Sequence, residues 1–159
     1  MPSNEMEYYD QKGLLDTTMT NYIGIASVLN EISRRMLKTN SGTIICLASV
    51  AGERGRQSNF IYGATKSAMI TYLQGLRMKL YKFNIHVITV MPGYVDTLMS
   101  YGKVKEILSV SPNYVAKRIY NIRKSNRNVV YIPRIWWFII KLLKMIPELI
   151  FKRLYFLVP

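Results

Sequence analysis

The amino-acid sequence predicts an α/β fold in which a parallel sheet is covered by helices and followed by an amphipathic helical tail. Two observations lead to this fold class. Segments with helical periodicity alternate with short apolar runs, in the order helix, strand, helix, strand, helix, strand, and such alternation is typical of parallel sheets. The chain has 159 residues, half of them hydrophobic, which is enough for one domain with its own core.

The first predicted helix follows a polar N-terminal segment. Residues 1–15 have weak periodicity, which indicates an irregular segment. Asp16 or Thr17 can cap a helix that reaches about Lys38, and apolar residues recur along it at helical spacing: Ile23, Ala26, Leu29, Ile32 and Met36. The turn-forming residues 40–42 end this helix.

Two strands and a second long helix follow. The apolar run of residues 43–48 is bounded by turn residues, which is how a strand buried on both faces looks in a sequence. Residues 49–59 are polar and contain two glycines, so we expect a loop there. A helix is predicted from about Phe60 to Lys82, and a second buried strand over residues 85–90. Met91-Pro92-Gly93 stops that strand.

The last predicted elements precede the tail. Residues 94–110 show no regular pattern. Ser111 followed by Pro112 is a favourable helix start, because serine caps the helix and proline suits its first position; this helix should reach about Lys124. Residues 129–132 form a third short strand. The predicted domain therefore spans residues 16–133, and residues 134–159 form a separate helical tail.

The charge is strongly basic beyond the N-terminus. Residues 1–20 contain four acidic side chains and one basic one, whereas the rest contains 21 basic and 5 acidic side chains. This balance predicts an anionic partner, which could be nucleic acid, a membrane surface or a phosphorylated ligand. Zinc-finger spacing and RNA-binding aromatic motifs are absent from the sequence, so we expect no nucleic-acid binding.

Neither a metal site nor a disulfide is expected. The single cysteine, Cys46, lies in an apolar run and cannot pair within the chain, which fits a reducing compartment. His86 alternates with apolar residues like an ordinary strand residue, and no second metal ligand is spaced to join it. The N-terminal ten residues resemble neither a signal peptide nor a transit peptide.

Tyr62 and Lys66 form the most informative pair in the sequence. Residues four apart share one helix face, and a neighbouring ammonium group favours the phenolate and so lowers a tyrosine pKa. Such a pair can transfer protons, although it also occurs on many ordinary surface helices. Ser49 ends the preceding buried strand. Ligands of open α/β sheets bind at the edge where the parallel strands end, and a hydroxyl there can donate to a substrate oxygen.

Four segments together resemble the successive motifs of the short-chain dehydrogenase/reductase family. They occur in the family's order and spacing: Thr20-Asn21-Tyr22-Ile23-Gly24, the segment Gly42 to Gly52, Tyr62-Gly63-Ala64-Thr65-Lys66, and Pro92-Gly93-Tyr94-Val95-Asp96-Thr97. The resemblance implies that the fold is the C-terminal half of a Rossmann-like doubly wound parallel sheet. It also implies NAD or NADP as cofactor, and a homo-oligomer formed through the helices of Asn21 and Tyr62.

The resemblance further implies roles for individual residues. Tyr62 would be the general acid/base, Lys66 would hold the nicotinamide ribose and lower the tyrosine pKa, and Ser49 would position the substrate oxygen. Asn21 would shape a proton-relay water site, although asparagine on a solvated helix face remains an alternative. The turn at Pro92 and Gly93, with Val95 and Thr97, would lie beside the nicotinamide carboxamide.

The sequence departs from the family at its beginning. A full member starts with a strand and a glycine-rich turn that receives the pyrophosphate at a helix N-terminus, and this chain has neither. We therefore expect a truncated member that is inactive alone. Two functions are open: an oxidoreductase acting on a ketone or secondary alcohol, or a non-enzymatic, membrane-associated remnant that only oligomerises.

The tail is unusual for the family. Its longest uncharged run, residues 135–140, has six residues, far short of the about 20 needed to span a bilayer. Pro147 should split its helix, and its charged residues share one narrow helix face: Lys141, Lys144, Glu148 and Lys152. Together with two tryptophans this pattern is typical of an interfacial membrane anchor, although a helix packed on the domain or on a dimer partner is the alternative.

The tail and residues 54–59 together resemble the decaprenylphosphoryl-ribose 2-oxo-reductase branch of the family. That resemblance implies a lipid-linked sugar as substrate, as opposed to an ordinary small molecule. The expected location is the cytoplasm, with peripheral contact at the inner face of the membrane.

Overall fold

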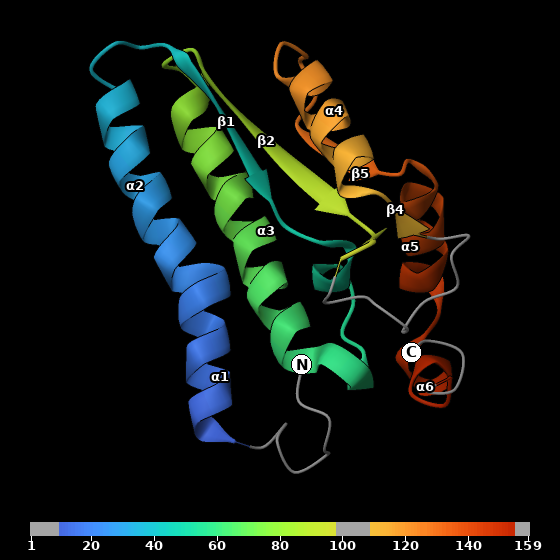
Figure 1. Cartoon of the computed structure of the whole chain (residues 1–159). Helices are drawn as coiled ribbons and strands as arrows, with labels where there is room; N and C mark the ends of the chain where they lie inside the picture. The colour runs from blue at the N-terminus through green and yellow to red at the C-terminus, as the bar shows by residue number, and fades with distance from the viewer. Residues whose placement is uncertain (1–9, 98–108, 155–159) are drawn as a thin grey trace.

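A computed structural model describes residues 10–97 and 109–154 and confirms the α/β class with a parallel sheet (Figure 1). The main sheet has the order β1-β2-β5, and its strands are β1 (Gly42–Leu47), β2 (Ile85–Pro92) and β5 (Val129–Ile132). All pairings are parallel; Gly42 lies opposite Ile85, and Thr89 lies opposite Val129. The carboxyl ends of all three strands therefore meet at one edge of the sheet.

Two long helical segments cover one face of this sheet (Figure 1). The first runs through α1 (Gln11–Thr18), a π-helical turn (Met19–Ile23) and α2 (Gly24–Met36), and the second is α3 (Phe60–Tyr81). Their apolar residues form one core cluster with β1 and the start of β2: Leu29, Ile44, Cys46, Met69, Leu73, Leu76, Leu80, Ile85 and Val87.

The first helix begins earlier than the sequence predicted. Residues 11–15, expected to be irregular, are helical, because the Asp10 side chain caps the helix start by accepting from the backbone N–H groups of Lys12 (3.1 Å) and Gly13 (3.0 Å). An aspartate at this position satisfies amide groups that have no partner within the helix. Residues 1–9, the remainder of the predicted irregular segment, lie outside the described residues.

Helix α4 (Pro112–Ile122) packs on the opposite face of the sheet. Adjacent residues of a strand point to opposite faces; Val87 belongs to the first cluster, whereas Ile88 contacts the residues of α4. The predicted start of this helix is confirmed, since the Ser111 hydroxyl accepts from the Tyr114 backbone N–H at 3.2 Å. Two short strands, β3 (Tyr94–Val95) and β4 (Ser109–Val110), form a separate parallel pair that the sequence did not predict.

The tail folds into α5 (Ile135–Met145) and α6 (Glu148–Phe151), and the predicted split at Pro147 is confirmed. Trp136 and Ile140 of α5 are buried against Ala48, Val50 and Met91 at the carboxyl edge of the sheet. The described part of the chain contains no helix with both the length and the apolar character needed to cross a bilayer.

Strand β1 is fully buried on one face only, contrary to the sequence prediction, while Ile45 on its other face is partly buried. Ile44 and Cys46 are buried against the helices, whereas the Leu47 side chain is 45% exposed. Among the described residues, β1 pairs with β2 alone, so its other edge carries unpaired backbone groups. Strand β2, flanked by β1 and β5, is buried along nearly its whole length, as predicted.

Candidate active site

Ser49 lies at the carboxyl edge of the sheet, two residues after β1 ends. The chain is held there because the Ala48 N–H donates to the Val90 carbonyl at 2.8 Å. Ser49 then caps a short 3-10 turn (Val50–Gly52), and its hydroxyl oxygen accepts from the Ala51 N–H at 3.1 Å. This bond uses the oxygen as acceptor and leaves the hydroxyl hydrogen available for another acceptor.

Two glycines let α3 approach this turn closely. A Cβ atom on Gly52 would lie 2.6 Å from the backbone carbon of Lys66, and a Cβ on Gly63 would lie 3.0 Å from the Ala51 carbonyl oxygen. Such contacts are too short for a side chain, so the close approach requires glycine at Gly52 and strongly favours it at Gly63. The approach places Tyr62 and Lys66 next to Ser49.

Tyr62 and Lys66 lie on one face of α3, as their spacing predicted. The Lys66 side chain is only 8% exposed, and its Nζ atom lies 5.5 Å from the centroid of the Tyr62 ring. Within the described residues no carboxylate forms a salt bridge with Lys66. A buried ammonium group without an acidic partner is costly in a purely structural role, so it marks this position as a functional candidate.

Burial dominates the titration of both groups. Burial raises the pKa of Tyr62, and the hydrogen-bonding Ser49 hydroxyl acts in the opposite direction. Burial also lowers the pKa of Lys66. The sequence prediction that Lys66 lowers the tyrosine pKa is therefore wrong for this structure as it stands, because removal of the phenolate from water outweighs the other effects. The phenol is a proton donor at neutral pH in this state.

Asn21 lies in the π-helical turn, which contacts α3. Its side-chain amide donates to the Thr17 carbonyl at 3.1 Å and is partly buried. The widened turn is accommodated by Gly24, whose N–H donates to Met19, five residues back. Sequence reasoning missed this π-helical turn, although an asparagine followed three residues later by a glycine inside a helix was the available signal. Such turns are frequent at functional sites.

The Pro92 segment turns at the same sheet edge as Ser49. Pro92 is the buried last residue of β2, and the Gly93 N–H donates to the Ile132 carbonyl at 2.9 Å. Val95 belongs to β3, and the exposed Thr97 hydroxyl donates to the Val95 carbonyl at 3.3 Å. A Cβ on Gly93 would lie 1.8 Å from the indole nitrogen of Trp136, so the tail fills the space beside this turn.

Long-range contacts join the tail to the loop between Ser49 and Tyr62. Arg54 donates to the Leu143 carbonyl, forms a salt bridge with Glu148 at 3.2 Å, and stacks over the Phe151 ring at 3.8 Å. Glu53 accepts from the Lys144 ammonium group. We name this set of contacts the Glu53–Arg54 clamp; sequence reasoning missed it because its residues are about 90 positions apart.

Two further polar contacts lie near the clamp. The Tyr131 hydroxyl donates to Glu53 at 2.8 Å, and burial together with this carboxylate raises the pKa of Tyr131. Arg56 donates to the Tyr94 hydroxyl at 3.2 Å, which links the loop before α3 to the segment after Gly93. Sequence reasoning did not identify these two contacts.

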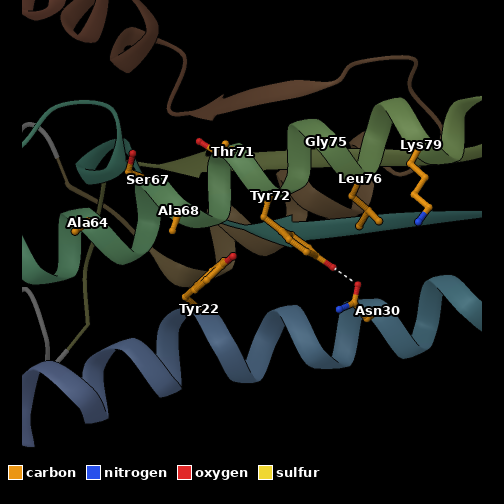
Figure 2. A pocket seen from close by; sticks show the side chains of 10 residues that line it. All are labelled: Tyr22, Asn30, Ala64, Ser67, Ala68, Thr71, Tyr72, Gly75, Leu76 and Lys79. Carbon is orange, nitrogen blue, oxygen red and sulfur yellow. Dashed lines mark hydrogen bonds between the residues drawn. The ribbon is translucent and has the colours of Figure 1, made fainter.

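A groove of 770 Å³ lies between the outer faces of α2 and α3, away from Ser49. Figure 2 shows the Tyr72 hydroxyl bridging the two helices by donating to the Asn30 side chain at 2.8 Å. Small and polar residues line most of the groove: Asn30, Ala64, Ser67, Ala68, Thr71, Gly75 and Lys79. Its shallow floor of small residues can admit side chains of another helix.

The family resemblance seen in the motifs is confirmed by comparison with known proteins. The sequence pattern of the short chain dehydrogenase family matches residues 2–107. An uncharacterized oxidoreductase of Mycobacterium tuberculosis is 27% identical over 135 residues, which cover 85% of this chain and 54% of that protein. One from Streptomyces coelicolor is 29% identical over 136 residues, covering 85% and 53%. The chain thus spans about half the length of these relatives.

Solved structures show the same fold. A short chain dehydrogenase from Burkholderia cenocepacia in complex with NADP superposes with a TM-score of 0.79 at 22% identity, over 92% of this chain and 60% of that one. A bulky-bulky ketone specific alcohol dehydrogenase from Comamonas testosteroni gives a TM-score of 0.72 at 20% identity, with the same coverage of both chains. The Rossmann-like parallel-sheet architecture is therefore confirmed.

Proposed function

This chain belongs to the short chain dehydrogenase family, and we propose that it carries the catalytic residues of an NAD(P)-dependent oxidoreductase acting on a ketone or secondary alcohol. One observation carries the proposal: the buried Lys66 ammonium group beside Tyr62, with Ser49 at the carboxyl edge of the sheet. Ligands of open α/β sheets bind at this edge.

Each residue has a role in the proposed reaction. A bound NAD(P)H would supply the hydride for the new C–H bond at the substrate carbonyl carbon. The Tyr62 hydroxyl gives its proton to the carbonyl oxygen, and in the reverse direction the phenolate takes that proton back. The Ser49 hydroxyl donates to the same oxygen and holds it in place. Asn21, in the π-helical turn against α3, orders water that restores the Tyr62 proton.

The residues present fit a nicotinamide nucleotide. The buried Lys66 ammonium has three donors and no carboxylate partner within the described residues, so ribose hydroxyls are suitable acceptors for it. The turn at Pro92 and Gly93, with Val95 and Thr97, is the proposed carboxamide site. The NADP complex of the Burkholderia cenocepacia relative supports this assignment.

The test compares matched variants within the longest open reading frame that contains this chain. Tyr62→Phe and Lys66→Ala should each lower kcat/KM for ketone reduction by at least about 100-fold, the usual contribution of a positioned proton donor. Tyr81→Phe and Lys82→Ala, at exposed positions at the end of the same helix, should leave it unchanged. Near-normal turnover in either active-site variant would contradict the assigned roles.

We further propose that the 159-residue chain needs an additional polypeptide segment to bind nucleotide. The open edge of β1 and the exposed Leu47 side chain support this, because the unpaired backbone groups of an edge strand can hydrogen-bond to a further strand. Titration calorimetry of the chain alone should then detect no NADH or NADPH binding up to millimolar concentrations. Micromolar affinity corresponds to about 8 kcal/mol, and a micromolar isotherm would overturn the proposal.

We also propose a substrate class and a cellular location. The substrate is a lipid-linked sugar, as in the decaprenylphosphoryl-ribose 2-oxo-reductase branch, and the protein is cytoplasmic with peripheral contact at the inner face of the membrane through residues 134–159. The basic charge beyond residue 20 and the apolar tail support both.

A second candidate is a non-enzymatic, membrane-associated family remnant that only oligomerises, favoured by the groove between α2 and α3. The DNA upstream separates the two functions. An in-frame segment encoding a glycine-rich turn supports the enzyme, and a degraded segment supports the remnant.

A further inference from the structure

The two faces of the docked tail differ sharply. Trp136 and Ile140 point inward and are buried against the edge of the sheet. On the outer side four large apolar residues recur at helical spacing and are 51% to 78% exposed: Ile135, Phe138, Leu142 and Met145. Leu149 and Ile150 of α6 are exposed as well. We name these six residues the outer apolar stripe.

The segment that carries the outer apolar stripe is rich in basic side chains. Residues 134–153 contain five basic side chains and one acidic one. The acidic residue, Glu148, is engaged by Arg54 in the clamp, and Lys144 is engaged by Glu53. Four cations have no salt bridge to the described residues: Arg134, Lys141, Lys152 and Arg153. Lys141 lies over the Trp137 ring at 3.9 Å.

This combination suits an anionic bilayer better than a protein partner. Large exposed apolar residues, a tryptophan and flanking cations suit the boundary between lipid headgroups and acyl chains. A protein partner would need apolar residues opposite the stripe and a separate acidic residue opposite each of the four cations. A bilayer with anionic lipids carries negative charge over its entire surface, so it can pair with these cations in any orientation of the protein about the membrane normal.

We propose that the outer apolar stripe is a membrane-binding face of the folded domain, used while α5 and α6 remain docked. The Glu53–Arg54 clamp then fixes the loop between Ser49 and Tyr62 next to the bilayer surface. A substrate with a lipid anchor would reach the site from the membrane side. The membrane face makes the proposed peripheral contact of residues 134–159 specific, and this last step rests on the proposed oxidoreductase function.

The first experiment measures binding to vesicles of phosphatidylcholine with and without phosphatidylglycerol, using the full chain. The triple variant Phe138→Ser, Leu142→Ser, Met145→Ser should bind the anionic vesicles at least tenfold more weakly. The control Met78→Ser, Tyr81→Ser removes side chains that are 81% and 83% exposed on α3 and should bind normally. Unchanged binding by the triple variant, an equal loss in the control, or a lost dimer without any vesicle binding would overturn the proposal.

The second experiment uses the two tryptophans, which are the only ones in the sequence. Trp136 is 5% exposed and points inward, whereas Trp137 is 40% exposed. With brominated phosphatidylglycerol, Trp136→Phe reports on Trp137, whose fluorescence should be strongly quenched. Trp137→Phe reports on Trp136, which should keep most of its intensity. Equal quenching of the two would mean that the tail leaves the domain to bind, and quenching of neither would mean that it does not bind.

Three further measurements support these experiments. Circular dichroism establishes that each variant keeps its helix content. If Trp136→Phe does not fold, the difference between the wild type and Trp137→Phe still reports on Trp137. Arg54→Gln loosens the clamp and should increase the quenching of Trp136 in the Trp137→Phe background. None of these measurements needs turnover, so failure of the membrane proposal is distinguishable from failure of the proposed enzyme.

Discussion

The Lys66 ammonium group lies 5.5 Å from the centroid of the Tyr62 ring, one turn further along α3. Burial lowers the pKa of the lysine and raises that of the tyrosine, because the charged form of each group is less stable here than in water. The fold therefore maintains a lysine whose charge is unfavourable in the absence of a ligand. This relationship leads to the first of four predictions.

Lys66→Met should stabilise the chain at neutral pH while removing the proposed nucleotide contact. The folded-state pKa of Lys66 is lowered, so the cost of its buried charge is fully present at neutral pH and disappears as the pH rises towards 10.5, its ordinary value. We expect a gain of roughly 1 kcal/mol, or about 2–4 °C in Tm. Thermal denaturation at pH 7 and pH 10 measures it; a gain that does not shrink at pH 10 would contradict the charge explanation.

Gly52→Ala should be strongly destabilising, because its Cβ would lie 2.6 Å from the Lys66 backbone carbon. Overpacking of this kind costs about 1–3 kcal/mol. Gly55→Ala is the matched control: no atom lies within 4 Å of its Cβ position, so alanine should change the free energy of unfolding by no more than about 1 kcal/mol. Urea denaturation compares both variants, and similar effects of the two would mean that α3 does not approach the Ser49 turn closely.

Gly93 and Trp136 should be energetically coupled. Gly93→Ala places a methyl group 1.8 Å from the Trp136 indole nitrogen, and Trp136→Ala removes the side chain that fills this space. The first change should cost about 1–3 kcal/mol in the wild type and far less in the Trp136→Ala background. A double-mutant cycle by denaturant unfolding measures the coupling; additive costs would show that α5 does not pack on this turn.

The groove between α2 and α3 should be an oligomer interface. Ala68 lies on its floor (Figure 2), so Ala68→Glu should place a carboxylate in the contact and convert a dimer into a monomer. Gln74→Glu adds the same charge at an exposed position of α3 that does not line the groove, and it should leave the dimer intact. Sedimentation velocity separates the outcomes, and a dimer that persists in Ala68→Glu would exclude this interface.

Much of the site could be predicted from the sequence because its signals are local. The spacing of Tyr62 and Lys66 determines that they share a helix face, and the position of Ser49 after an apolar run determines that it ends a strand. The sequence also predicts the end of β2 near Pro92 and Gly93, although the strand runs to Pro92, two residues beyond the predicted 85–90, and β3 follows Gly93 directly. The split of the tail at Pro147 likewise needs only the neighbouring residues.

The boundaries and burial that were mispredicted depended on weak or distant signals. The weak periodicity of residues 11–15 predicts a helix start at Asp16 or Thr17, whereas the cap at Asp10 starts α1 earlier. The one-sided burial of β1 follows from which strands lie beside it, which an apolar run does not encode. The pKa direction of Tyr62 reversed because burial depends on the surrounding side chains more than on its nearest charge.

The sequence by itself determined the family, the order of the main helices and strands, and the positions of Ser49, Tyr62 and Lys66 in them. Only the tertiary structure decided that Arg54 and Glu53 clamp the tail, that Trp136 packs on Gly93, and that one face of α5 remains exposed. The physical reason is the separation along the sequence of the residues that interact. Periodicity, caps and strand stops act within a few residues, whereas ion pairs and packing between residues about 90 positions apart exist only after the sheet has brought the two segments together.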